Sequence, residues 1–211
     1  MIRVKICGVN DEAAFDAAAA AGADWVGFVF FARSPRYVTP ARAASISARL
    51  EGGPGRVGLF VEPGDLDIEA TLARMKLDVL QIYAPPARLE EIAARFAVPI
   101  WRSVPVTGRA DLPTGIAPAS ALLVEPKPPP GATRPGGNAA ALDWSLLKSW
   151  APAYSWLLAG GLQPGNVARA IAESGATAVD VSSGVETEPG QKSPQLIHAF
   201  VQAARRERPN R

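Results

Sequence analysis

Short apolar runs alternate with alanine-rich amphipathic runs along most of the chain. The apolar runs are rich in Val, Ile, Leu and aromatic residues, and most are apolar throughout rather than at every second position. This pattern is typical of strands that are covered on both faces, as in a parallel sheet. The predicted strands span residues 2–6, 25–30, 56–61, 78–83, 99–104, 121–125, 155–159 and 178–182.

The amphipathic runs predict helices at 11–21, 40–50, about 65–75, 87–96, 143–150, 164–174 and 193–207. Asn10 or Asp11 is a candidate N-cap for the first helix, and Gly22 is a stop signal after it. The second helix begins at Pro40, a residue that suits the first helical turn. Residues 105–120 hold three prolines and two glycines, so we expect the fifth helix to be short or missing.

Eight strands in 211 residues give a repeat of roughly 26 residues. Units of that size predict an α/β fold, a single-domain TIM (β/α)8 barrel over 1–211, at the short end of the size range for this fold. The alternative is an open, doubly wound sheet. Polar or glycine-rich sequence follows many of the strands, which favours the barrel. The proline-rich stretch 126–135 is interpreted as a long loop and not as a domain boundary.

Composition excludes several classes of protein. The chain has 22 basic and 20 acidic residues, a balance too even for a nucleic-acid binder or a membrane-surface protein. No run approaches roughly 18 apolar residues, and the N-terminus lacks the apolar stretch of a signal peptide, so we expect a cytoplasmic protein with no membrane span. A group of arginines near the C-terminus is interpreted as a solvated helix end: Arg205, Arg206, Arg208 and Arg211.

The scarcity of cysteine and histidine limits the chemistry. The single cysteine, Cys7, excludes an internal disulfide and a multi-cysteine metal site. The single histidine, His198, lies on a predicted helix beside apolar residues, which indicates a structural or surface role. A Ser-His-Asp centre is therefore disfavoured. Acid–base chemistry must come from carboxylates, Cys7, Lys or Tyr, and we expect no metal site.

Glycine-rich turns follow the sixth, seventh and eighth predicted strands. In a barrel the active site lies at the C-terminal ends of the strands, and the end of the last two is a frequent phosphate site. Bare backbone amides in such turns can hold an anion together with the helix N-termini that follow. The alternative is that the glycines only serve tight turns. The candidate phosphate-binding residues are Gly137, Asn138, Gly160, Gly161, Ser182, Ser183 and Gly184.

Four more candidates lie at or near strand ends. Cys7 is either a small buried hydrophobe or a thiolate whose pKa is lowered by Lys5 on the same strand face. Glu125 ends the sixth strand, where a buried carboxylate needs a partner or a function, and a surface position is the alternative. Arg36 can bind a carboxylate through both arms of its fork or be solvated. Asp180, inside the eighth strand, can accept a hydrogen bond or contact substrate.

These residues belong to segments that resemble the phosphoribosylanthranilate isomerase family of tryptophan biosynthesis. The segments run in the family's order and cover nearly the whole chain. The resemblance implies a TIM barrel, an Amadori rearrangement of N-(5′-phosphoribosyl)anthranilate, a phosphorylated small-molecule substrate, and no cofactor or metal. Either a monomer or a homodimer is compatible with it. The matching segments are 5–8, 22–24, 27–30, 34–38, 57–61, 143–144, 158–162 and 179–186.

The resemblance gives each candidate a role. Cys7 would be the general base, and Glu125 would be the general acid in place of the family's aspartate. Arg36 would bind the anthranilate carboxylate, and Asp180 would line the site. Tyr83, a candidate substrate contact, stands where the family's Gln-Leu-His-Gly motif has its histidine. The glycine-rich turns would bind the phosphate.

Three departures from the family pattern leave alternatives open. Glu125 is one methylene longer than aspartate, which can misplace the proton donor by about 1 Å. Tyr83 replaces the histidine, and Ala139 replaces the last glycine of the loop that begins Gly136-Gly137. The alternatives are an isomerase acting on a related phosphosugar and a catalytically impaired or non-catalytic barrel that binds a phosphorylated ligand.

Overall fold

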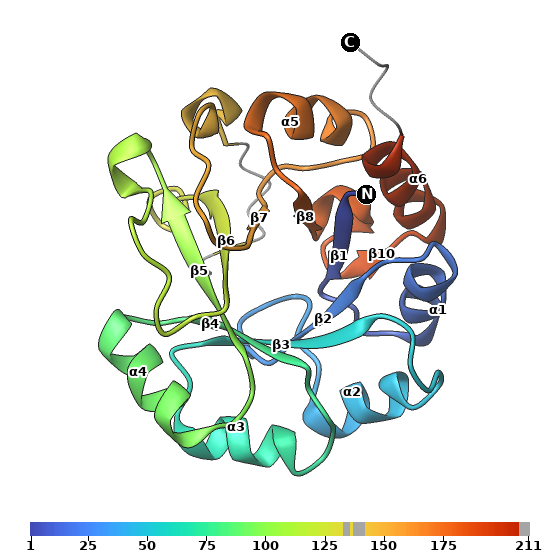
Figure 1. Ribbon diagram of the computed structural model, residues 1–211. Helices are drawn as coiled ribbons and strands as arrows, with labels where there is room; N and C mark the ends of the chain where they lie inside the picture. Colours follow the sequence, from blue (N-terminus) through green and yellow to red (C-terminus); the bar gives the residue numbers. More distant parts are fainter. Residues whose placement is uncertain (133–135, 137–141, 207–211) are drawn as a thin grey trace.

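Eight parallel strands close into a barrel in the computed structural model of the chain (Figure 1). The structure describes residues 1–132, 136 and 142–206. Each strand pairs with the next, and β8 pairs with β1, which confirms the predicted barrel and excludes the open sheet. The strands are β1 (Arg3–Cys7), β2 (Trp25–Val29), β3 (Gly55–Val61), β4 (Val79–Tyr83), β5 (Ile100–Val106), β6 (Ala121–Pro126), β7 (Trp156–Leu158) and β8 (Ala178–Val181).

Helices surround the strands (Figure 1). Asp11 caps the first helix by accepting a hydrogen bond from the Ala14 amide at 2.8 Å, and Pro40 begins the second helix. The α-helices are α1 (Glu12–Ala20), α2 (Pro40–Ser47), α3 (Asp65–Leu72), α4 (Pro86–Arg95), α5 (Val167–Ser174) and α6 (Pro194–Arg205). A single 3-10 turn, η1 (Arg109–Asp111), stands where the fifth helix was expected to be short or missing.

Two predictions of local structure are wrong or incomplete. The helix expected at 143–150 is only one 3-10 turn, η2 (Trp144–Leu147). Ser149 has a φ of 68°, a left-handed conformation that a right-handed helix cannot include. After β8 and the turn η3 (Ser183–Val185), a small antiparallel hairpin of β9 (Glu186–Glu188) and β10 (Gln191–Lys192) was not predicted.

The barrel interior is apolar at one end and polar toward the other. The end formed by the N-terminal parts of the strands is filled by Val57, Val79, Trp101, Ala121, Leu157 and Ala178. Because side chains two residues apart share a strand face, the next positions along β1, β4, β5 and β8 also point inward. They are Lys5, Gln81, Ser103 and Asp180, all of them buried. A polar layer therefore lies directly beneath the mouth of the barrel.

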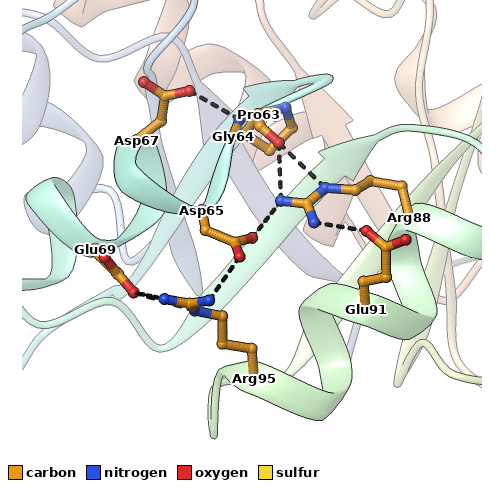
Figure 2. Close-up of polar contacts among 8 residues, drawn as sticks. All are labelled: Pro63, Gly64, Asp65, Asp67, Glu69, Arg88, Glu91 and Arg95. Atoms are coloured by element: carbon orange, nitrogen blue, oxygen red, sulfur yellow. Dashed lines mark hydrogen bonds and ion pairs between the residues drawn. The ribbon is translucent and has the colours of Figure 1, made fainter.

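On the outside, charged side chains join α3 to α4 (Figure 2). Arg88 reaches Asp65 at 2.5 Å and Glu91 at 2.8 Å, and Arg95 reaches Asp65 at 2.9 Å and Glu69 at 2.5 Å. Arg88 also donates to the Pro63 carbonyl, while Asp67 accepts from the Gly64 amide at the start of α3. These contacts tie two neighbouring helices together on the barrel surface.

At the end of α6, Arg205 is held to the barrel, whereas Arg206 is exposed as predicted. Arg205 forms an ion pair with Asp24 at 2.8 Å and donates to the Gly22 carbonyl at 2.7 Å. The interpretation of this arginine as part of a solvated end is therefore wrong, and Arg208 and Arg211 lie outside the described residues. His198 lies on α6 and is partly exposed. Within residues 1–132, 136 and 142–206, no helix is both long enough and apolar enough to cross a membrane.

Candidate functional site

A cavity opens at the C-terminal ends of the strands. Because β-strands of a barrel converge there, residues far apart in sequence meet at one mouth. The cavity brings together six of the residues singled out in the sequence: Cys7, Arg36, Tyr83, Glu125, Asp180 and Ser182. The Gly136 backbone and Gln81 also line it.

Cys7 ends β1 with its thiol buried and faces the charged pair below it. Lys5 Nζ lies 2.7 Å from Asp180 Oδ1, and both side chains are almost completely buried. Burial raises the pKa of the Cys7 thiol, and the Asp180 charge raises it further, although the Lys5 ammonium lowers it through its charge and a hydrogen bond. The lowered pKa that would make Cys7 a resting thiolate is therefore not found, because burial and Asp180 outweigh Lys5.

Gly27 gives Lys5 and Cys7 their space. A Cβ at this position would lie 3.1 Å from Cys7 Sγ, from Lys5 Cε and from Lys5 Nζ. Since Gly27 pairs with Cys7 across β1 and β2, the missing side chain is what allows two inward side chains to share this level of the barrel. Burial lowers the pKa of Lys5, but the charge and hydrogen bond of Asp180 more than offset this and raise it, so Lys5 keeps its proton.

Glu125 ends β6 and is buried, which confirms the buried position over the surface alternative. Burial raises the pKa of this carboxyl to about 8, helped by the Asp180 charge, while a hydrogen bond from Tyr83 and the Lys5 charge act in the opposite direction. The carboxyl is therefore protonated at neutral pH. Among the described residues its Oε1 atom has no hydrogen-bond partner, and neither does Oε1 of Gln81. Both atoms are buried, and each keeps an unused capacity to form a hydrogen bond.

Arg36 is held firmly by residues that the sequence analysis missed. Its Nε and Nη2 donate to the two carboxylate oxygens of Glu186 at 2.7 and 2.8 Å. Lys192, from the hairpin, lies 2.5 Å from Glu186 Oε1 and donates to the Ser182 carbonyl. Burial would raise the pKa of Glu186, but hydrogen bonds and charges from Arg36 and Lys192 hold it below its ordinary value. The guanidinium plane is thereby fixed at the cavity wall.

The turns after β7 and β8 lie side by side, since Leu158 of β7 pairs with Val179 of β8. Gly160 and Gly161 have φ angles of 90° and 63°, which favour glycine. The turn geometry therefore requires glycine at these two positions, and neither Gly160 nor Gly161 is among the residues that line the cavity. Ser183 and Gly184 begin η3 next to this turn. Gly137 and Asn138 lie outside the described residues.

A metal site is not supported by the described part of the chain, where no three His, Cys, Asp or Glu residues gather in a way that could hold an ion. The site instead has one protonated carboxyl, one thiol and one fixed guanidinium around a partly polar cavity. This set can donate a proton, accept a proton and hold an anionic group.

Comparison with known proteins identifies the family. The family model for N-(5′-phosphoribosyl)anthranilate (PRA) isomerase matches residues 4–203. The N-(5′-phosphoribosyl)anthranilate isomerase of Acidiphilium cryptum is 52% identical over 204 residues, and the match covers 97% of this chain and 98% of that protein.

Solved structures agree with the family model. Phosphoribosyl anthranilate isomerase from Thermotoga maritima matches with a TM-score of 0.82 at 33% identity, over 97% of this chain and 98% of that chain. Another match, over the same shares, is an isomerase in complex with reduced 1-(o-carboxyphenylamino)-1-deoxyribulose 5-phosphate, with a TM-score of 0.79 at 31% identity. A further Thermotoga maritima structure contains monomers generated from the dimeric enzyme. This chain therefore belongs to the N-(5′-phosphoribosyl)anthranilate isomerase family of tryptophan biosynthesis.

Proposed function

We propose that this isomerase carries out the Amadori rearrangement of N-(5′-phosphoribosyl)anthranilate with Glu125 as general acid and Cys7 as general base. The observation that carries the proposal is the buried carboxyl of Glu125, which lines the same cavity as the Cys7 thiol. A pKa of about 8 keeps the proton on Glu125 at neutral pH while leaving it acidic enough to be given away.

The first step opens the sugar ring. Glu125 gives its proton to the ring oxygen as the C1–O bond breaks, and the nitrogen lone pair forms the C1=N bond of an iminium ion. Glu125 is left as a carboxylate, whose negative charge is favoured by the Lys5 ammonium. Glu125 is neutral before the proton transfer, and the carboxylate that the transfer leaves lies near a cation. The surroundings of Glu125 therefore suit both of its charge states.

The second step removes the proton from C2 of the sugar. Cys7, as thiolate, takes the proton, and the C2–H electrons form a C1=C2 double bond while the iminium nitrogen is neutralised. The resulting enolamine becomes the amino ketone when C1 gains a proton and the C2 hydroxyl loses one. Because burial raises the pKa of Cys7, the thiolate is a minor form, and the Lys5 charge is what makes it accessible.

Binding is assigned to the groups around the reacting atoms. Arg36, fixed by Glu186, would hold the anthranilate carboxylate, and Asp180 and Tyr83 would line the sugar. The turns at Gly160–Gly161 and Ser182–Gly184 would hold the phosphate, with Gly137 and Asn138 as further candidates. One barrel domain over 1–211, a cytoplasmic location, and a monomer or homodimer remain part of this proposal.

The test compares Glu125→Gln and Cys7→Ala with wild type in a continuous assay that follows the loss of substrate fluorescence. We expect kcat to fall about 10²- to 10⁴-fold in each variant, the range that one acid or base contributes. Glu90→Gln, at an exposed position on α4, is the matched control and should keep wild-type turnover. Undiminished turnover in either variant would remove the assigned role. A wild type that shows no turnover, yet whose melting temperature rises with the product analogue, would indicate a binding-only barrel.

A further inference from the structure

We propose that Tyr83 is the positioning residue for Glu125, holding one carboxyl oxygen so that the other points its proton at the substrate. The proposal rests on the assignment of Glu125 as the general acid. Tyr83 ends β4 and Glu125 ends β6, on strands separated by β5. Both side chains line the cavity at the mouth.

The close approach of the two side chains is visible at Gly136. A Cβ on this glycine would lie 2.6 Å from Tyr83 Oη and 2.8 Å from Glu125 Oε2. Both oxygens therefore lie close to Gly136, and a side chain at this position would clash with them. The φ of Gly136 is not in the left-handed region, so space at the pair, and not the backbone conformation, is what requires glycine here.

A chain of donors fixes the direction of the Tyr83 hydroxyl. Gln81 Nε2 donates to Ser103 Oγ at 3.1 Å, which leaves the Ser103 proton to be donated onward. Burial raises the pKa of Tyr83. The Glu125 carboxyl raises it further and the Ser103 hydroxyl lowers it, as an acceptor from and a donor to the Tyr83 hydroxyl would. When Tyr83 accepts from Ser103, its own proton is available for Glu125. The order of donation thus runs from Gln81 through Ser103 and Tyr83 to the carboxyl group.

This order selects the oxygen that carries the proton. Tyr83 Oη and Glu125 Oε2 share the space beneath Gly136, while the buried Oε1 has no partner among the described residues. A neutral carboxyl group that accepts a hydrogen bond on one oxygen keeps its proton on the other. Oε1 is therefore assigned the proton, and Tyr83 fixes the rotation of the carboxyl group at the cavity wall.

Other charged groups also act on the pKa of Glu125, so they contribute to the pH profile of the enzyme. Lys5 from β1 and Asp180 from β8 act on its pKa through their charges, and Cys7 acts on that of Tyr83. The hydrogen bond from Tyr83 lowers the pKa of Glu125. Its loss should therefore move the pH at which Glu125 titrates upward, a change that a purely space-filling role would not produce.

The test is the pH profile of kcat and KM for Tyr83→Phe, made in wild type and in Glu125→Asp. In wild type we expect kcat to fall about tenfold and KM to change less than about twofold. The part of the pH profile in which activity falls as Glu125 loses its proton should move to higher pH. In Glu125→Asp the shorter side chain withdraws from Tyr83, so the same substitution should lower kcat less than about threefold. Tyr154→Phe, which removes a hydrogen bond to the Pro113 carbonyl, is the matched control and should leave kcat unchanged.

The proposal would be overturned if Tyr83→Phe kept the wild-type kcat and left the pH at which Glu125 titrates unchanged. It would also be overturned if Tyr83→Phe lowered kcat by the same factor in wild type and in Glu125→Asp. If Tyr83→Phe does not fold, Ser103→Ala takes its place, with a smaller fall in kcat and the same direction of shift expected. Glu125→Gln separates the two assignments. If it keeps turnover, the general acid is wrong; if it loses turnover while Tyr83→Phe is unaffected, only the positioning role fails.

Discussion

Burial decides which groups in this site carry a proton. Glu125 and Cys7 are both buried at the mouth, and burial raises the pKa of each. For the acid this is useful, because a carboxyl must be protonated to donate. For the base it is unfavourable, because a thiol with a raised pKa forms less thiolate. The Lys5 ammonium lowers the pKa of Cys7, and the Asp180 charge raises it again in part. The two groups thus need a common cation, and Lys5 lies where it acts on both.

Glu125 should make the protein less stable as pH rises. Its pKa is about 8 in the folded state against an ordinary 4.5, so the folded state binds this proton more tightly. The contribution is fully present below pH 4.5 and is lost as pH rises through 8. We expect the free energy of unfolding of wild type to fall relative to Glu125→Gln by on the order of 4 kcal/mol between pH 5 and pH 9, measured by urea titration.

The control for this prediction is Glu90→Gln, a substitution of the same kind on the exposed face of α4. Its free energy of unfolding should follow that of wild type across the same pH range. Parallel curves for wild type and Glu125→Gln would contradict the prediction, since they would mean that Glu125 titrates alike in the folded and unfolded states.

Gly27→Ala tests how tightly the general base is placed. The added methyl would lie 3.1 Å from Cys7 Sγ and from Lys5 Nζ, so one of them has to move. A contact of this length requires a shift of a few tenths of an ångström, and displacements near 1 Å can cost on the order of 10²-fold in rate, so we expect kcat to fall about three- to fivefold while circular dichroism stays unchanged. Gly108→Ala, whose Cβ would meet nothing within 4 Å, is the control. Equal kcat in the two variants would show that the site tolerates the shift.

The sequence located single residues better than their partners. Cys7 and Glu125 could be found because each ends a predicted strand, and strand ends face the mouth of a barrel. The pairs Lys5–Asp180 and Arg36–Glu186 could not, because 175 and 150 residues separate their members. The contact of Lys5 with Asp180 depends on the register in which β8 meets β1, and that of Arg36 with Glu186 on where the β9–β10 hairpin packs, and no local pattern contains either. Likewise, two of the three departures from the family pattern, Glu125 and Tyr83, come together at one cavity only in the structure.

Among the elements, the β9–β10 hairpin has the clearest connection with the site. It brings Glu186 and Lys192 against Arg36, which comes from the loop after β2. Glu186→Gln loses the charge that holds both arms of the guanidinium. We expect KM for phosphoribosylanthranilate to rise about tenfold, with a smaller change in kcat, because the loss of a charged hydrogen-bonding partner loosens a binding group. Steady-state kinetics measure both constants.

A control for this experiment lies in the same hairpin. Glu188 is exposed and accepts only a long hydrogen bond of 3.4 Å from Gln191. Glu188→Gln should therefore leave KM at the wild-type value. A comparable rise in KM for both variants would point to the hairpin as a whole, and no rise in Glu186→Gln would show that Arg36 needs no such support.

The contacts between α3 and α4 should contribute little and should depend on salt (Figure 2). Arg88 bridges Asp65 and Glu91, but Glu91 is 66% exposed, so water and ions screen the pair. We expect Arg88→Ala to lower the melting temperature by no more than about 3 °C at low salt and by less in about 1 M NaCl. Arg74→Ala, at an exposed position on the segment after α3, is the control. A larger loss that persists in salt would assign the network a structural role.

Elements were predicted well where the chain repeats a simple pattern. Every β-strand of the barrel lies within two residues of its predicted range, since a fully buried strand is apolar throughout. The prediction failed where turn geometry overrides composition. Residues 143–150 have helical apolar spacing, yet Asp143 caps a single turn and Ser149 takes a left-handed conformation. The β9–β10 hairpin has too few residues to show alternation.

At the scale of the whole molecule, the site spans the seam where the barrel closes. Cys7 stands on β1 and Asp180 on β8, and these strands are the first and last of the sheet. The proposed phosphate turns follow β7 and β8 on the same side of the seam. A ligand that binds there contacts only the folded chain, so it should stabilise the entire barrel, and the stabilisation should grow with the logarithm of the ligand concentration.

Phosphate should therefore raise the melting temperature, and a negative charge at its site should prevent this. With inorganic phosphate at about 100 times its dissociation constant, the folded state gains about 2.7 kcal/mol, which corresponds to roughly 5–10 °C for a domain of this size. Ser183→Asp places a like charge at the start of η3 and should abolish the rise, while chloride at equal ionic strength should produce none in either protein. If Ser183→Asp responds to phosphate as wild type does, the anion binds elsewhere, and the turns after β7 and β8 serve only to close the barrel.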